Sequence, residues 1–111
     1  CTLPTFAYSK INWQPQLPFS KQDATKQLLY SRIIKIQLLF KERFWGREDF
    51  AVNTDSLSHF IFHTSQQQTN TKGILTSYAI GDKAFILSRM NKNQQAKYTL
   101  EALKPIFGEN Q

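Results

Sequence analysis

Two histidines have a spacing that could support metal chemistry. His59 and His63 are four residues apart, a spacing at which two imidazoles can share one metal ion if they lie on a helix. The intervening Phe60-Ile61-Phe62 favours a strand, where positions four apart share a face but lie too far apart to chelate easily. No third ligand is evident in the sequence. We therefore expect no metal site.

One lysine has unusual neighbours. Lys10 lies among the apolar residues Tyr8, Ile11 and Trp13, whereas most lysines in proteins are solvated surface charges. An ammonium group held beside apolar side chains can take part in catalysis, but this context alone is weak evidence for such a role. Lys10 becomes a specific candidate only through the resemblance described below.

The usual signatures of cofactor binding and catalysis are missing. The sequence contains no G-x-G-x-x-G, no P-loop, no H-E-x-x-H and no nucleophile elbow. Its four glycines cannot supply a dinucleotide cradle together with the turns needed elsewhere. We expect that this chain by itself does not bind a nucleotide cofactor strongly.

The positive charge does not indicate a nucleic-acid-binding surface. The net charge is +6, but the basic residues are scattered and form no block of five or six. Trp13 and the Phe44-Trp45 pair could stack on bases, although aromatic residues in a small core are the commoner explanation. We expect no nucleic-acid partner. A stand-alone basic α+β module that binds nucleic acid or a protein partner remains the alternative from another functional class.

Length and composition suit one modest folded domain. The chain has 111 residues, 41% of them hydrophobic, and nine are phenylalanine. No apolar run is long enough for a transmembrane helix. The sequence starts at Cys1 and shows no targeting segment, so we expect a piece cut from a longer protein. Its location is unknown from the sequence, with the cytoplasm as the default. A single cysteine cannot form an internal disulfide.

Hydrophobic periodicity predicts strands and helices in a defined order. Residues Arg32 to Phe40 alternate with a period of two and predict a strand. The other predicted strands are Cys1–Tyr8 (a strand or strand end), Phe60–Thr64 and Ile74–Ile80, and the predicted helices are Lys21–Leu29, Asp82–Arg89 and one from Asn91 to Gly108. Ser20 with Asp23, and Asn91 with Gln94, have capping-box spacing. Ser65–Lys72 reads as an exposed polar loop. The fold class is α+β, a mainly antiparallel sheet of about three to five strands with helices on one side.

Three stretches resemble one enzyme family. Thr2–Thr5 leading into Lys10-Ile11-Asn12-Trp13-Gln14-Pro15-Gln16-Leu17-Pro18 is similar to a segment of flavin monoamine oxidases and L-amino-acid oxidases. Lys35–Trp45 resembles the long strand of that family ending in Phe-Trp, and Gly73–Ala84 resembles its strand-to-helix junction. Their order and spacing cover nearly the whole chain.

The resemblance implies that residues 1–111 are a single domain, most of the substrate-binding domain of a larger flavoenzyme. Residues 1–18 would be the strand and connection that arrive from the FAD-binding part. Such an enzyme oxidises a primary or secondary amine, or an amino acid, to an imine and releases hydrogen peroxide. Its partners would be the small-molecule amine and the FAD-binding domain of the same chain. FAD would belong to the full-length protein, and the isolated fragment would be inactive. A related FAD-dependent desaturase or polyamine oxidase remains open.

The resemblance also assigns site residues. Lys10 matches the lysine of the family that contacts the reactive flavin nitrogen through a water, which makes it the catalytic and cofactor-contacting candidate. Phe60, Phe62 and Tyr78 would line the substrate cavity, although an ordinary core role is an equal alternative. Phe62-His63 stands where L-amino-acid oxidases often have paired tyrosines. The absent hydroxyl favours, slightly, an amine that lacks a carboxylate.

Overall fold

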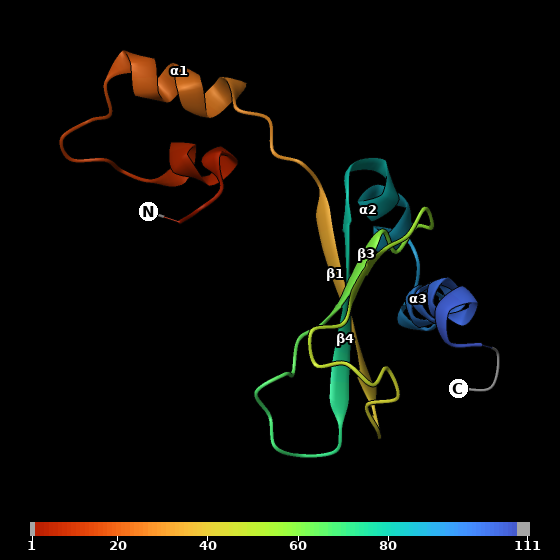
Figure 1. Ribbon diagram of the computed structural model, residues 1–111. Coiled ribbons are helices and arrows are strands. Elements are labelled where there is room, and N and C mark those ends of the chain that lie inside the picture. Colours follow the sequence, from red (N-terminus) through yellow and green to blue (C-terminus); the bar gives the residue numbers. More distant parts are fainter. Residues whose placement is uncertain (1, 109–111) are drawn as a thin grey trace. The chain divides into compact units, whose positions relative to one another are not determined.

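The computed structural model describes residues 2–108, and Cys1 lies outside them. The chain divides into two compact units, Cys1–Ser31 and Arg32–Gln111, and each is described by itself. The first unit contains the 3-10 helix η1 (Thr5–Lys10) and the helix α1 (Phe19–Gln27). The second contains β1 (Ile33–Phe40), β2 (Ala51–Asn53), β3 (Phe60–His63), β4 (Gly73–Ile80), α2 (Gly81–Ser88) and α3 (Lys92–Phe107), as Figure 1 shows. In the described residues, no helix is both long and apolar enough to span a bilayer.

The first unit begins with a helical turn, so the strand predicted over Cys1–Tyr8 is wrong. Pro4 is extended, and its carbonyl accepts a hydrogen bond from the Ala7 amide at 2.9 Å, which closes the first turn of η1. These local bonds satisfy the backbone without a neighbouring strand. The segment that follows is not helical and bends at Gln14 and Pro15, where the peptide bond is cis.

Helix α1 exists as predicted, but its start differs. The carbonyl of Pro18 accepts the first backbone hydrogen bonds, so the helix begins at Phe19. The capping box predicted for Ser20 and Asp23 is absent, because Ser20 already lies inside the helix and the Asp23 carboxylate accepts from Gln27 Nε2 at 2.7 Å. No residue of α1 is buried within its unit, and the helix contacts η1.

The second unit is built on a four-stranded antiparallel sheet in the order β1-β4-β3-β2. The three strands predicted after residue 31 are confirmed to within a residue or two at each end. Strand β2 was not predicted, because three residues are too short to display a period of two. The observed architecture confirms the predicted α+β class.

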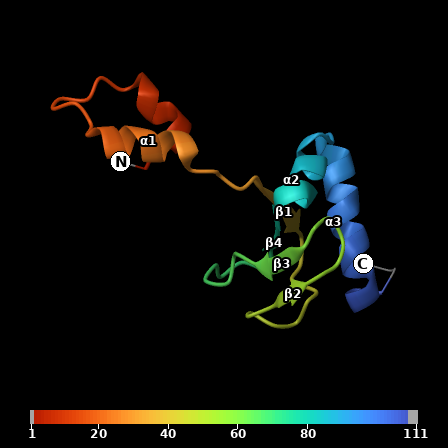
Figure 2. The same ribbon diagram turned by 90° about the horizontal axis from the view of Figure 1, so that it is seen from above.

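Helices α2 and α3 cover one face of this sheet (Figure 2). Alternate residues of β4 determine that face: Leu75 packs with Leu103 of α3, and Ala79 packs with Ala84 and Leu87 of α2. Because side chains alternate along a strand, the residues between them point to the opposite face, on which neither helix lies.

The two helices begin differently. Helix α2 follows directly from β4 at Gly81, whose φ is +60°, and no side chain caps it, so Asp82 does not start the helix as predicted. The capping box of α3 is confirmed, with the Asn91 side chain accepting from the Gln94 amide and the Gln94 side chain accepting from the Asn91 amide, each at 3.0 Å. Gly108, with φ +85°, ends α3 as predicted.

Arg43, three residues after the end of β1, anchors the polar loop Ser65–Lys72 through hydrogen bonds. Its guanidinium donates to the carbonyls of Ser65 at 3.0 Å, Gln68 at 2.5 Å and Lys72 at 3.0 Å, and to the Glu48 carboxylate at 2.8 Å. The Arg43 side chain is only 17% exposed. We therefore expect Arg43→Met to lower the free energy of unfolding by about 2–3 kcal/mol, since charged hydrogen bonds from a half-buried group are lost. Urea unfolding, and amide hydrogen exchange of the loop, measure the effect.

Arg47→Met is the matched control. Arg47 pairs with Asp49 at 3.2 Å, but the two side chains are 76% and 75% exposed. The hydrogen bond from Arg47 lowers the pKa of Asp49, yet an exposed pair of this kind adds little stability. Equal losses of stability in the two variants would contradict the anchoring role of Arg43.

Candidate functional site

The three aromatic residues predicted to line a substrate cavity lie together on the helix-free face of the sheet. In the register, Phe60 of β3 is opposite Tyr78 of β4, and Phe62 is opposite Thr76. Their neighbours Ile61, Leu75 and Ala79 point to the helix-covered face. The alternation of side chains therefore places Phe60, Phe62 and Tyr78 on the other face, two of them directly across from each other.

Ring contacts connect these residues and add a lysine. The rings of Phe60 and Phe62 are stacked, with centroids 5.1 Å apart. Lys35 Nζ of β1 lies 5.6 Å from the centroid of the Tyr78 ring. Lys35 is paired with Tyr78 in the register, so Lys35, Tyr78 and Phe60 form one row across three strands.

The helix-free face is apolar and partly uncovered. Ile33, Leu39 and Ile80 on its border are 55%, 66% and 44% exposed. A sheet face that meets water normally carries polar residues, whereas an exposed apolar face marks a contact with something else. Neither of the hydrophobic clusters under the helices includes Phe60, Phe62 or Tyr78. Within the described residues, these three partly buried side chains therefore lie outside both helix-covered clusters.

The two histidines have different surroundings. His63 is buried against Trp45, with ring centroids 5.0 Å apart, and its nitrogens contact the Glu48 carbonyl at 3.0 Å and Ser65 Oγ at 2.9 Å. His59 lies in the β2–β3 hairpin with φ +54°, and its Nδ1 is buried without a hydrogen-bond partner. Across residues 2–108, no cluster of three His, Cys, Asp or Glu side chains could hold a metal ion.

The Phe44-Trp45 pair belongs to the core. Trp45 is 5% exposed and meets Phe40 and Phe44 edge to face, at 5.8 and 5.2 Å between centroids, while Phe44 also meets Phe107 at 5.1 Å. The buried Trp45 ring therefore cannot stack on bases. The structure thus gives Trp45 a role in the core, whereas Trp13 is only partly buried in the first unit.

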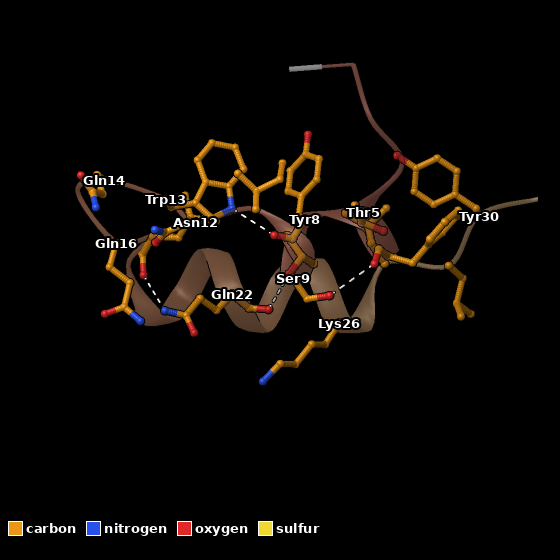
Figure 3. Close-up of a pocket in the computed structure, with 16 residues that line it drawn as sticks. Thr5, Tyr8, Ser9, Asn12, Trp13, Gln14, Gln16, Gln22, Lys26 and Tyr30 are labelled. Carbon is orange, nitrogen blue, oxygen red and sulfur yellow. Dashed lines mark hydrogen bonds between the residues drawn. The ribbon is translucent and has the colours of Figure 1, made fainter.

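Lys10 is the last residue of η1, and its side chain is exposed. Nearby, Trp13 Nε1 donates to the Tyr8 carbonyl at 3.1 Å, and the two rings lie 5.7 Å apart (Figure 3). A pocket of about 880 Å³ in the first unit is lined by Tyr8, Ser9, Ile11 and Trp13 among others, but not by Lys10. The structure therefore brings the three aromatic residues together, whereas Lys10 is described only within its own unit.

Lys35 lies beside Tyr78 on the helix-free face, although the sequence did not single it out. The alternation in β1 showed it on the face opposite Ile34 and Ile36, but every strand with a period of two has such positions. Only the register, which pairs Lys35 with Tyr78, shows which residues it meets. The sequence offers no signal for that pairing.

The described residues do not form a complete FAD site. A dinucleotide cradle needs a glycine-rich turn that leads into the N-terminus of a helix. The nearest equivalent is Gly81 before α2, but Gly81 is a lone glycine and the first turn of α2 carries Asp82, whose charge would repel a pyrophosphate. The described residues therefore contain no cradle for the pyrophosphate of FAD, and Lys10 contributes an exposed ammonium group in the first unit.

Comparison with characterised proteins extends this description. The chain is 30% identical over 103 residues to an L-amino-acid oxidase of Daboia siamensis, a match that covers 90% of this chain and 25% of that protein. It is 34% identical over 103 residues to an L-amino-acid oxidase of Crotalus adamanteus, covering 90% of this chain and 20% of that protein. A putative L-amino-acid oxidase of Bacillus subtilis is 29% identical and matches 97% of this chain. The chain thus spans about a quarter or less of the length of these relatives.

Comparison of the fold with solved structures agrees with the sequence comparison. Putrescine oxidase, solved with putrescine bound, superposes with a TM-score of 0.73 at 16% identity, over 96% of this chain and 24% of that one. The family described as flavin containing amine oxidoreductase matches residues 1–111. The match over the full sequence, together with the sheet and its helices, confirms the predicted resemblance: the chain belongs to the family of flavin-containing amine oxidoreductases.

Proposed function

We propose that this chain forms most of the substrate-binding domain of an FAD-dependent oxidase. The enzyme oxidises a primary or secondary amine, or an amino acid, to an imine and releases hydrogen peroxide. The observation that carries the proposal is the helix-free sheet face, where Phe60, Phe62 and Tyr78 adjoin one another and apolar side chains remain exposed. Family membership supplies the reaction class.

The aromatic residues act on the substrate through shape and exclusion of water. The stacked Phe60 and Phe62 rings offer an apolar surface for the carbon skeleton of the amine, and the Tyr78 ring extends it across the next strand. A substrate held against this surface loses rotational freedom, which favours a reactive orientation. FAD, when bound by the complete enzyme, supplies a two-electron acceptor for the hydride that leaves the amine carbon.

Lys10 is the residue of this chain that we assign to the flavin. Its ammonium is exposed and lies at the end of η1, so it is free to donate hydrogen bonds to a water and through that water to a neighbouring group. A fixed positive charge at this position would stabilise the negative charge that develops on the electron acceptor while the amine is oxidised.

An amine screen with the full-length enzyme tests the proposed function. We expect the visible absorbance of the flavin to fall anaerobically with at least one amine or amino acid, and to return on exposure to oxygen with one hydrogen peroxide per imine formed. The isolated 111-residue chain is expected to be colourless and inactive, because it lacks a dinucleotide cradle.

Each other outcome has a distinct meaning. Flavin reduction without peroxide would identify a desaturase-like enzyme that passes electrons elsewhere. In a panel of primary amines, secondary amines and polyamines, a preference for polyamines would identify a polyamine oxidase. If no amine reduced the flavin of a correctly folded and loaded enzyme, the proposed function would be wrong.

A further inference from the structure

The row of Lys35, Tyr78 and Phe60 places one cation among uncharged and mostly apolar side chains. The strand positions that point to this face are Ile33, Lys35, Gln37 and Leu39 of β1, Ile74, Thr76, Tyr78 and Ile80 of β4, Phe60 and Phe62 of β3, and Ala51 and Asn53 of β2. Lys35 is the only charged residue among them. These strand positions therefore carry one positive charge and no carboxylate.

The ammonium of Lys35 has no acidic partner within the described residues. None of the ion pairs formed by residues 2–108 includes it. Its recorded contact is with the ring of Tyr78, 5.6 Å from the centroid, a cation–π distance that holds the ammonium above the ring without neutralising it. Lys35 thus keeps its full capacity to bind an anionic group.

The spacing on the face suits a small molecule with two different ends. Lys35 and Phe60 lie two strands apart, so roughly 10 Å separates their backbones. An amino acid can place its apolar side chain on the Phe60–Phe62 stack and extend its carboxylate towards the ammonium of Lys35. A diamine would bring a second positive charge to the same place, where like charges repel.

We infer that Lys35 is a specificity-determining residue that binds the carboxylate of an amino-acid substrate beside the Tyr78 ring. This inference rests on the proposed function, because it requires that the helix-free face meets the substrate. It also replaces the expectation, drawn from Phe62-His63, that the substrate is an amine without a carboxylate. The missing tyrosine hydroxyl removes one possible carboxylate partner, and Lys35 provides another from the neighbouring edge of the sheet.

The test compares two substrates that differ by one group in the full-length enzyme. L-Phenylalanine and 2-phenylethylamine share a side chain, and only the first has a carboxylate. Lys35→Met should lower kcat/KM for L-phenylalanine about tenfold, mainly through KM, and leave that for 2-phenylethylamine within about twofold. Lys35→Arg should retain the preference, and Lys35→Glu should shift it towards putrescine. Lys92→Met, which removes an exposed lysine from the start of α3, is the matched control.

Benzoate binding separates this inference from the proposed function, because it requires no turnover. By calorimetry on the flavin-loaded enzyme, we expect the affinity for benzoate to fall about tenfold in Lys35→Met and to remain in Lys92→Met. If Lys35→Met binds benzoate more weakly but the unmodified enzyme oxidises no amine, the carboxylate site is supported and the proposed function is refuted. Amine oxidation with an unchanged substrate ratio and unchanged benzoate binding in Lys35→Met would refute the role of Lys35 alone. Absence of benzoate binding by the unmodified enzyme would also refute it.

Discussion

Gly73→Ala is expected to lower the free energy of unfolding by about 3 kcal/mol or more, although it adds a single methyl group. Gly73 is the first residue of β4 and lies opposite Phe40 of β1. A β-carbon at Gly73 would lie 2.5 Å from Cζ2 of Trp45 and 2.8 Å from Cγ of Arg43, and it would also overlap Trp45 Cη2. Contacts this short cannot persist, so either the strand or the indole must move.

The indole has little room to move. Trp45 is 5% exposed and is enclosed by Phe40, Phe44 and His63, whose rings lie 5.0 to 5.8 Å from it. His63 is itself fixed by its contacts with Glu48 and Ser65, so a shift of the indole would break buried polar contacts as well as packing. Urea unfolding followed by tryptophan fluorescence measures the loss.

Two comparisons isolate the cause. Gly46→Ala adds the same methyl group where nothing lies within 4 Å, so its cost should be the backbone strain of φ +68° alone, about 1 kcal/mol. Trp45→Phe removes the ring atoms that Gly73→Ala would meet, so the double variant should be more stable than the sum of the single losses predicts, by about 1–2 kcal/mol. Strict additivity would show that Trp45 is not what excludes a side chain at Gly73.

Patterns that extend over a whole element could be predicted from the sequence. The alternation in β1 and the helical periodicity of the segment from Asn91 to Gly108 each involve many residues, so one exception does not obscure them. The Asn91–Gln94 capping box was found because its two hydrogen bonds join residues three apart. The same spacing at Ser20 and Asp23 gave a wrong prediction. The Pro18 carbonyl accepts the first backbone hydrogen bonds, so the helix begins two residues earlier than predicted.

The parts that could not be predicted depend on contacts distant in sequence. The resemblance identified Phe60, Phe62 and Tyr78, but only strand register shows that they share a face with Lys35. Period-two patterns do not reveal which strands pair, and a shift of one residue would turn every side chain to the other face. The requirement for glycine at residue 73 likewise arises from Trp45, which lies on a different part of the chain.

Lys10→Met is expected to slow amine oxidation by the full-length enzyme about 100-fold. Lys10 is the only residue of this chain that we assign to the flavin, and methionine keeps the length of the side chain while removing its charge and its three donors. A pre-positioned donor aimed at developing negative charge typically contributes about 10²–10³ in rate, far more than an exposed charge contributes to stability. Because Lys10 is exposed within its unit, the substitution should leave the free energy of unfolding nearly unchanged.

Stopped-flow absorbance locates the loss. If Lys10 holds a water against the flavin, Lys10→Met should slow flavin reduction by the amine, reoxidation by oxygen, or both, while Lys10→Arg should recover part of the rate because it keeps the charge. Lys21→Met in α1 removes an exposed lysine from the same unit and should leave both rates within about twofold. A methionine variant with both half-reactions at the rates of the unmodified enzyme would show that Lys10 has no part in the chemistry.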